Sequence, residues 1–236
     1  MQRKNSSNSN HKATPTPSLP PRGGGRGGGE THSYYPAFLN LQGKRVVVVG
    51  GGKVAERKVL ALLRAGASIT VISPEITKRI AREKPTGRIR HIPRQYQKGD
   101  VKDAFLVIAA TDSHSINKKV SEGAPCLVNV VDTPSLCNFI VPSVVRQGPL
   151  TIAASTSGVS PALSKSIRKE LEKLYGSEFA KYLRLLEKIR KKAMEEIRDK
   201  KQRTEFFKSL ASEEMIKMLR QKGFKEVEKI LYRLKG

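Results

Sequence analysis

The sequence predicts an α/β protein, with a Rossmann-type parallel sheet followed by a small β-hairpin and helix region and by a helical C-terminus. Three observations predict it. Strand-like and helical segments alternate from residue 34 to about residue 131. A glycine turn, Gly50-Gly51-Gly52, joins four consecutive valines to a helical stretch. From Ser160-Pro161 to the end, nearly every segment has a helical pattern.

The alternating part contains five predicted strands. Their connections include helical patterns, and this succession is typical of parallel strands covered by helices on both faces. The predicted strands cover residues 45–49, 68–73, 89–94, 104–110 and 126–131, and the predicted helices cover 54–65, a short stretch from Glu75, and 113–122.

The pattern then changes. Residues 138–145 and 150–155 are strand-like and flank Arg146-Gln147-Gly148-Pro149, which predicts a hairpin. Ser160-Pro161 is a strong helix start, with serine as N-cap and proline at the first helical position. Further helices are predicted over 177–201, 212–221 and 224–235. An amphipathic stripe that favours a packing or dimer surface is formed by Phe179, Tyr182, Leu183, Leu186 and Ile189.

Composition limits the class of protein. The chain has 236 residues, 38% hydrophobic and 28% charged, which is enough for a real core. No apolar run is long enough to span a bilayer, and no secretory signal is apparent. Cys126 and Cys137 are expected to be two thiols of a reducing compartment rather than a disulfide. We therefore expect a soluble, cytoplasmic protein.

The formal net charge of +24 is spread along the chain. Residues 34–160 carry 18 basic and 8 acidic residues, and residues 161–236 carry 22 and 12. Such a field favours a polyanion: nucleic acid, an anionic membrane or a highly carboxylated small molecule. Residues 1–33 are rich in Ser, Asn, Pro, Gly and Arg, and we interpret them as a disordered extension. An Arg/Gly contact with RNA or a transit peptide are weaker alternatives for this segment.

The glycine turn predicts a nucleotide site. Gly50, Gly52 and Ala55 fit G-x-G-x-x-G/A between a buried strand and a helix, where the helix N-terminus can hold a pyrophosphate. After the second strand come Ser73-Pro74-Glu75, with an acidic residue displaced into the loop and no arginine directly after it. This favours NAD over NADP. The cofactor-binding residues that these patterns predict are Gly50, Gly51, Gly52, Ser73 and Thr111.

Two other strand ends carry polar residues. Asp112 follows the fourth strand and is interpreted as the N-cap of the next helix. Asp132 follows the fifth strand at the same edge of the sheet and is a candidate general base, with a solvated turn carboxylate as the alternative. The hydroxyl-rich loop 155–160 could hold carboxylates or phosphate, or could only cap a helix. The four histidines and two cysteines have no metal-site spacing, so no permanent metal is expected.

Taken together, the segments resemble the precorrin-2 dehydrogenases, which also form the N-terminal module of siroheme synthases. The resemblance covers about residues 34–175. Its motifs, in order, are Tyr35-Pro36-Ala37-Phe38-Leu39-Asn40-Leu41, the stretch from Val48 to Lys58, Ala109-Ala110-Thr111-Asp112, Asn129-Val130-Val131-Asp132, Phe139-Ile140-Val141-Pro142-Ser143, and the stretch from Ser155 to Pro161.

This resemblance implies an NAD-dependent oxidation of precorrin-2, a polycarboxylate tetrapyrrole, to sirohydrochlorin. It implies Asp132 as the key active-site aspartate, and Lys53, Val54, Pro74 and Glu75 as further cofactor-binding residues. The candidate substrate-binding residues are Asn129, Ser155, Thr156 and Ser157. Thr156 stands where some bacterial members have serine. The resemblance also implies an intertwined homodimer, with an NAD-binding domain at 34–142, a dimerisation region at 143–175 and a helical domain at 176–236.

Three functions stay open at this point. One is the dehydrogenase alone, and the second adds insertion of ferrous iron to make siroheme. The third is a non-enzymatic module that senses NAD(H) and holds a partner through its basic helices. We expect neither nucleic acid nor a membrane as partner. The methylation step found in fused siroheme synthases would belong to another protein, since no second large α/β domain is apparent.

Overall fold

The computed structural model describes residues 34–233. A five-stranded sheet in the order β3-β2-β1-β4-β5 is parallel throughout. Val49 at the end of β1 is paired with Ile72 of β2 and Ala109 of β4, so the carboxyl ends of these strands share one edge. The strands are β1 Arg45–Val49, β2 Ser68–Ile72, β3 Ile89–Ile92, β4 Leu106–Ala109 and β5 Leu127–Val130. The Rossmann-type sheet predicted from the sequence is therefore confirmed.

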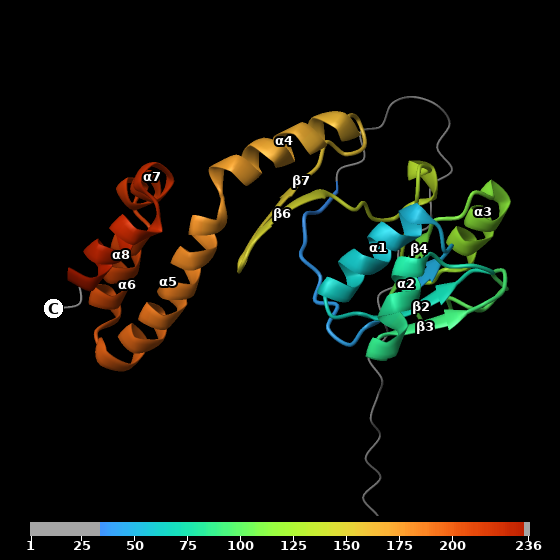
Figure 1. Ribbon diagram of the computed structural model, residues 1–236, viewed down its shortest axis with the longest axis horizontal. Coiled ribbons are helices and arrows are strands. Elements are labelled where there is room, and N and C mark those ends of the chain that lie inside the picture. The colour runs from blue at the N-terminus through green and yellow to red at the C-terminus, as the bar shows by residue number, and fades with distance from the viewer. Residues whose placement is uncertain (1–33, 234–236) are drawn as a thin grey trace, which may run out of the picture. The chain divides into compact units, whose positions relative to one another are not determined.

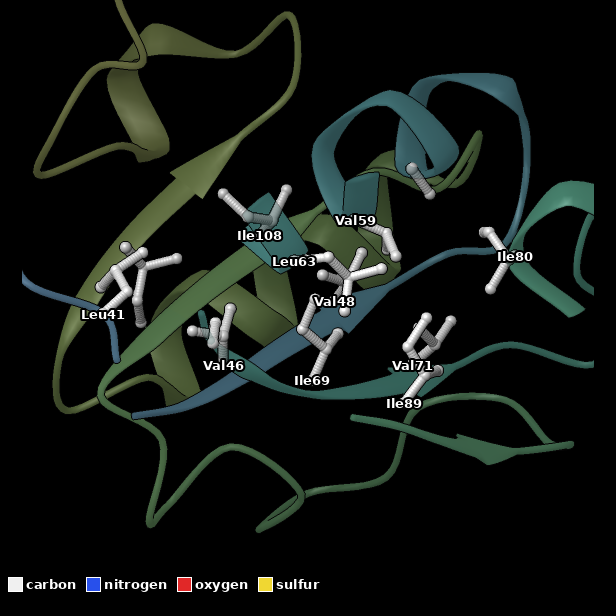
Figure 2. Close-up of a cluster of buried hydrophobic side chains, with 13 residues drawn as sticks. Leu41, Val46, Val48, Val59, Leu63, Ile69, Val71, Ile80, Ile89 and Ile108 are labelled. Atoms are coloured by element: carbon white, nitrogen blue, oxygen red, sulfur yellow. The ribbon is translucent and has the colours of Figure 1, made fainter. Parts of the chain in front are cut away.

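Helices cover both faces of this sheet (Figure 1). The valines of β1 alternate between two cores because successive side chains of a strand point to opposite faces. Val46 and Val48 pack with Val59 of α1 (Figure 2), whereas Val47 and Val49 pack with Val120 of α3. The helices of this part are α1 Lys53–Arg64, α2 Lys78–Glu83 and α3 His114–Gly123, with short 3-10 turns η1 Lys84–Thr86 and η2 Pro134–Leu136.

The hairpin predicted after the sheet is present. Strands β6 Ser143–Gln147 and β7 Leu150–Ala154 pair antiparallel around Gly148-Pro149. Gly148 has φ +59°, a conformation that glycine adopts without strain. Helix α4 Pro161–Leu174 follows, and its first turn is capped as expected: Ser160 Oγ accepts from the N–H of Leu163 at 3.2 Å. Helix α4 packs on both strands of the hairpin.

Four helices complete the described chain: α5 Ser177–Glu196, α6 Lys200–Leu210, α7 Glu213–Lys222 and α8 Phe224–Arg233. Their common core contains the predicted stripe of α5, with Phe179, Tyr182 and Ile189 buried. Leu219 of α7 and Val227 of α8 lie in the same core. The helical C-terminus is therefore confirmed, with its amphipathic stripe turned inward.

Most predicted elements differ from the structure by one or two residues at an end, and three differ by more. The helix expected from Glu75 begins at Lys78, because Thr77 caps it through a 3.3 Å bond from the N–H of Ile80. Strand β6 begins at Ser143 rather than residue 138, because Asn138 is held by β5: its Oδ1 accepts from the N–H of Val128 at 2.7 Å. The helix predicted over 177–201 breaks after Glu196, where Asp199 caps α6.

A fourth difference concerns Asp112, which was expected to cap the helix after β4. Ser113 caps α3 instead, by accepting from the N–H of Ile116 at 3.4 Å. The predicted disordered extension, residues 1–33, lies outside the described residues. Among the helices of residues 34–233, none combines the length and apolar character needed to span a bilayer.

Candidate functional site

The backbone of the glycine turn after β1 lies very close to the backbone of two other segments. Gly50 has φ +115° and donates its N–H to Ile72 O at 2.9 Å. A Cβ at Gly50 would lie 2.3 Å from Ala110 O, and one at Gly51 would lie 1.9 Å from Glu75 O. Both positions therefore require glycine for the path of the chain itself.

Gly52 differs from its two neighbours. It has ordinary extended backbone with φ −77°, and a Cβ there would meet no atom within 4 Å. Gly52 is the N-cap of α1, and no side chain caps this end of the helix. The first N–H groups of α1 are thus available to an anion, and the helix dipole favours a negative charge there. An open glycine at an uncapped helix start fits the approach of a pyrophosphate.

A cleft of about 1100 Å³ lies at this edge of the sheet. Cofactor pockets typically measure roughly 300–1,000 Å³, so the space is large enough for a dinucleotide. All nine residues that the sequence proposed for the cofactor line it: Gly50, Gly51, Gly52, Lys53, Val54, Ser73, Pro74, Glu75 and Thr111. Asp132 also lines it.

Thr111 is held in place by hydrogen bonds with a residue of α3. Asn117 is buried, and its Oδ1 accepts from the Thr111 hydroxyl at 2.7 Å and from the Thr111 N–H at 3.3 Å. Its Nδ2 donates to Thr111 O at 2.9 Å. These three bonds fix the loop between β4 and α3 where it forms a wall of the cleft.

Asp132 has φ +58°, a left-handed conformation that is uncommon outside glycine. Backbone of this kind is frequent at functional sites, where the surrounding structure imposes it. Lys58 of α1 lies within electrostatic range of Asp132. Burial and the positive charge of Arg57 lower the pKa of Lys58, and the negative charge of Asp132 acts in the opposite direction. Lys58 is half-buried and does not itself line the cleft, whereas Asp132 is exposed and does.

The four residues proposed for the substrate do not line this cleft. Asn129 is buried in β5, and its Nδ2 donates to Phe139 O at 3.1 Å. The Thr156 hydroxyl donates to Ser160 O and accepts from Ser160 N–H, both at 3.0 Å. Ser155 Oγ accepts from the N–H of Ser157 at 3.0 Å, and Ser157 has φ +53°. Their roles in substrate binding stay predictions.

Cys126 and Cys137 are free thiols. Burial raises the pKa of both, so both stay protonated at neutral pH. Cys137 Sγ accepts from the N–H of Val130 at 3.1 Å, which ties η2 to the end of β5. Within residues 34–233, no three His, Cys, Asp or Glu side chains gather as they would around a metal ion.

Sequence reasoning missed part of the cleft wall. Gln95 and Tyr96 line the cleft but belong to no motif. They follow β3, which is paired with β2 along Ile69 to Ile72. Strand order could have indicated them. In a parallel sheet, polar residues that follow a strand next to β2 lie at the same edge as the residues that follow β2. Asn117 was also missed, since an asparagine inside a helical pattern is usually a surface residue.

Comparison with known proteins agrees with this geometry. Residues 37–143 match the family model described as putative NAD(P)-binding, and residues 147–174 match the model described as sirohaem biosynthesis protein central. The fold, the glycine turn and the cleft thus define a Rossmann protein of the NAD(P)-binding class.

The individual proteins that this chain resembles are more specific than the family models. The siroheme synthase of Thioalkalivibrio sulfidiphilus is 39% identical over 180 residues, which are 75% of this chain and 37% of that protein. The siroheme synthase of Methylobacillus flagellatus is 43% identical over 149 residues, 62% of this chain and 32% of that protein. This chain thus spans about a third of the length of these relatives.

A solved structure, "SirC, precorrin-2 dehydrogenase", superposes with a TM-score of 0.70 at 28% identity. The match covers 83% of this chain and all of that one. The resemblance to precorrin-2 dehydrogenases and to siroheme synthases that the sequence motifs indicated is therefore confirmed.

Proposed function

We propose that this protein binds NAD⁺ and dehydrogenates precorrin-2 to sirohydrochlorin. One observation carries the proposal: the glycine turn and Asp132 line one cleft at the carboxyl edge of the sheet. Hydride acceptance and proton removal must occur on one substrate molecule, so both groups are needed in one space. The similarity to a precorrin-2 dehydrogenase over the whole of that structure supports the substrate.

The proposed chemistry removes a hydride and a proton from the tetrapyrrole. When bound, NAD⁺ supplies the hydride acceptor. Gly52 and the start of α1 hold the pyrophosphate, and Ser73, Pro74 and Glu75 hold the adenosine end. Asp132 accepts the proton released at the substrate carbon. The fixed left-handed backbone at Asp132 orients its carboxylate as a general base requires.

The substrate-binding roles of Asn129, Ser155, Thr156 and Ser157 are also part of the proposal. Asn129 acts through the backbone of Phe139, to which it donates. The exposed side chains of Ser155 and Ser157 can donate to substrate carboxylates, whereas the Thr156 hydroxyl organises the loop for them. The net charge of +24 supports attraction of a polycarboxylate.

We further propose a homodimer formed through residues 143–175. In α4, the apolar side chains Leu163 and Leu174 are 52% and 49% exposed, and Ser164 is the buried residue of this helix. A helix that long with an uncovered apolar stripe favours a partner surface. We place the protein in the cytoplasm, where reducing conditions keep Cys126 and Cys137 as thiols.

The test is anaerobic turnover with the full chain, NAD⁺ and enzymatically made precorrin-2. NADH formed in step with sirohydrochlorin establishes the dehydrogenase. Asp132→Asn should lower kcat by about 10²-fold or more and leave the Kd for NAD⁺ unchanged, because only the base is lost. Asp103→Asn, an exposed acid outside the cleft, is the control. A normal rate in Asp132→Asn would exclude it as the base.

Addition of ferrous ion to the same mixture tests the second candidate function. Loss of sirohydrochlorin faster than without enzyme would show that the protein also inserts iron. Folded protein that turns over precorrin-2 with neither NAD⁺ nor NADP⁺ would contradict the proposal and favour a binding module.

A further inference from the structure

The corner of the cleft beside β2 and β3 decides which dinucleotide fits. In Rossmann folds the segment after the second strand meets the adenosine ribose, where an acid binds the 2′-hydroxyl of NAD and a nearby arginine accommodates the 2′-phosphate of NADP. Here that segment is Ser73, Pro74 and Glu75. Its backbone is joined to the end of β3, since Ser73 N–H donates to Ile92 O at 3.2 Å and His91 Nε2 lies 2.9 Å from Ser73 O.

An arginine is present at this corner. Arg94 follows β3, and its backbone N–H donates to Ile92 O, the carbonyl that Ser73 also uses. Its neighbours Gln95 and Tyr96 line the cleft, but Arg94 is not among the lining residues. Arg94 is thus one residue from the cleft wall with its side chain directed elsewhere.

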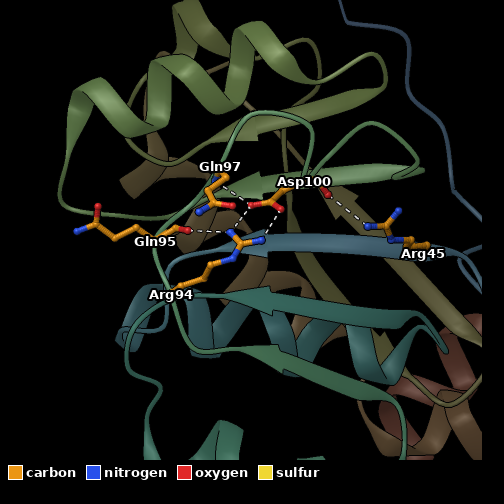
Figure 3. Close-up of polar contacts among 5 residues, drawn as sticks. All are labelled: Arg45, Arg94, Gln95, Gln97 and Asp100. Carbon is orange, nitrogen blue, oxygen red and sulfur yellow. Dashed lines mark hydrogen bonds and ion pairs between the residues drawn. The ribbon is translucent and has the colours of Figure 1, made fainter.

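Asp100 holds that side chain (Figure 3). Both terminal nitrogens of Arg94 donate to the two carboxylate oxygens of Asp100, each at 2.8 Å, and one also donates to Gln95 O at 2.9 Å. Gln97 N–H donates to Asp100 at 2.8 Å and fixes the carboxylate. The Asp100 side chain is only 13% exposed. Paired donation of this kind is stronger and more directional than a single ionic contact. The pKa of Asp100 is lowered, chiefly by its bonds from Arg94.

We propose that Asp100 sets the preference for NAD over NADP by holding the Arg94 guanidinium away from the adenosine ribose. This inference rests on the proposed function in one respect, that the cleft binds a dinucleotide. With Arg94 engaged, a 2′-phosphate at this corner meets the Glu75 carboxylate without a compensating arginine. The ribose 2′-hydroxyl of NAD carries no charge and has no such requirement.

The test is calorimetric titration of the full chain with NAD⁺ and with NADP⁺. Asp100→Asn removes the charge that holds Arg94, while the amide oxygen can still accept from Gln97 N–H. We expect the Kd for NADP⁺ to fall about tenfold and the Kd for NAD⁺ to change by less than about twofold. The gain should weaken with added salt because it is an ionic contact at a partly exposed site. Asp103→Asn, an acid of the same loop that pairs with Arg45, is the matched control and should change neither Kd.

Two further variants make the result decisive. Arg94→Gln with Asp100→Asn should lose the whole gain for NADP⁺, since the gain requires the freed guanidinium. Arg94→Gln alone should leave both affinities as in the parent protein. The inference is overturned if Asp100→Asn does not tighten NADP⁺, if the double variant keeps the gain, or if Arg94→Gln alone selectively weakens NADP⁺. A parent protein that binds neither dinucleotide would instead refute the proposed function.

Discussion

The Asn117 side chain binds both the backbone and the hydroxyl of Thr111. The Asn117 amide oxygen accepts from the hydroxyl and the N–H of Thr111, and its amide nitrogen donates to the Thr111 carbonyl. Asn117 is 5% exposed, so these bonds have no competition from solvent. A helix on one face of the sheet thereby determines the shape of the loop at its carboxyl edge.

Replacing Asn117 by alanine should therefore impair the cleft. The variant leaves the Thr111 N–H and carbonyl without their partner, at a cost of about 1–3 kcal/mol in the free energy of unfolding. We expect the Kd for NAD⁺ to rise about tenfold and kcat to change far less, because our proposal places Thr111 beside the cofactor rather than beside the reacting atoms. Lys118→Ala, at an exposed position of the same helix, should change neither quantity. Equal losses in the two variants would remove Asn117 from this role.

Alanine substitutions at Gly50 and Gly52 should have different effects, the first on stability and the second on cofactor binding. Gly50→Ala places a methyl group 2.3 Å from Ala110 O and forces alanine into φ +115°, so we expect a loss of about 3 kcal/mol or more of stability. Gly52→Ala meets no atom and keeps an ordinary φ, so its unfolding free energy should stay within about 1 kcal/mol. The new methyl group would nevertheless stand in the path of the pyrophosphate.

Thermal unfolding and calorimetry on the two variants check this contrast. Gly52→Ala should unfold like the parent protein and bind NAD⁺ at least about tenfold more weakly. Undiminished NAD⁺ binding in Gly52→Ala would show that the phosphates lie elsewhere. A stable Gly50→Ala protein would show that the turn can shift away from Ala110.

Local patterns were sufficient for the sheet and for the part of the cleft wall formed by the glycine turn. Four valines in a row predicted a strand buried on both faces, and Val46 to Val49 do alternate between the two cores. The glycine motif predicted the phosphate-binding part of the cleft, because backbone that closely approaches a phosphate must lack side chains. The position of Asp132 at this cleft was predictable because the carboxyl ends of parallel strands share an edge.

The remaining features depend on how short segments fold back on themselves, which a single sequence does not display. Arg94 and Asp100 are six residues apart, and nothing in a single sequence shows that the loop folds back to pair them. The break at Asp199 was missed because the charged stretch around it suits a continuous helix, and only the cap distinguishes the two cases. The sequence left the loop 155–160 open to binding an anion or to capping a helix, and the bonds of the Thr156 hydroxyl to Ser160 stabilise the turn before α4.

Tyr182 should make the helical C-terminus sensitive to alkali. Its hydroxyl donates to Leu210 O in the core, and burial raises its pKa to about 12 from 10.0. The unfolded chain then loses the proton near pH 10, whereas the folded chain keeps it to about pH 12. Stability contributed by Tyr182 is complete below pH 10 and falls by about 1.4 kcal/mol per pH unit between these values.

Urea unfolding followed by circular dichroism at about pH 9 and about pH 11 checks the sign. Tyr182→Phe lacks the ionisable group, so its stability should fall less than that of the parent protein over this interval. Tyr35→Phe, at a position 92% exposed, should behave like the parent protein. An equal fall in all three proteins would assign the alkaline loss to lysine deprotonation instead.

Leu163 tests the proposed dimer. It belongs to a stripe on α4 with Ile167, Leu171 and Leu174, whose spacing of three and four residues places them on one side of the helix. Leu163→Glu puts a charge into any apolar interface formed by that stripe, which should weaken association by about 3 kcal/mol or more, over a hundredfold in Kd. Lys165→Gln makes the same change of one unit in net charge on the opposite side of α4, and should leave association unchanged. Sedimentation equilibrium over a range of concentrations distinguishes these outcomes. A parent protein that sediments as a monomer at all concentrations would contradict the dimer, and a dimeric Leu163→Glu protein would move the interface away from α4.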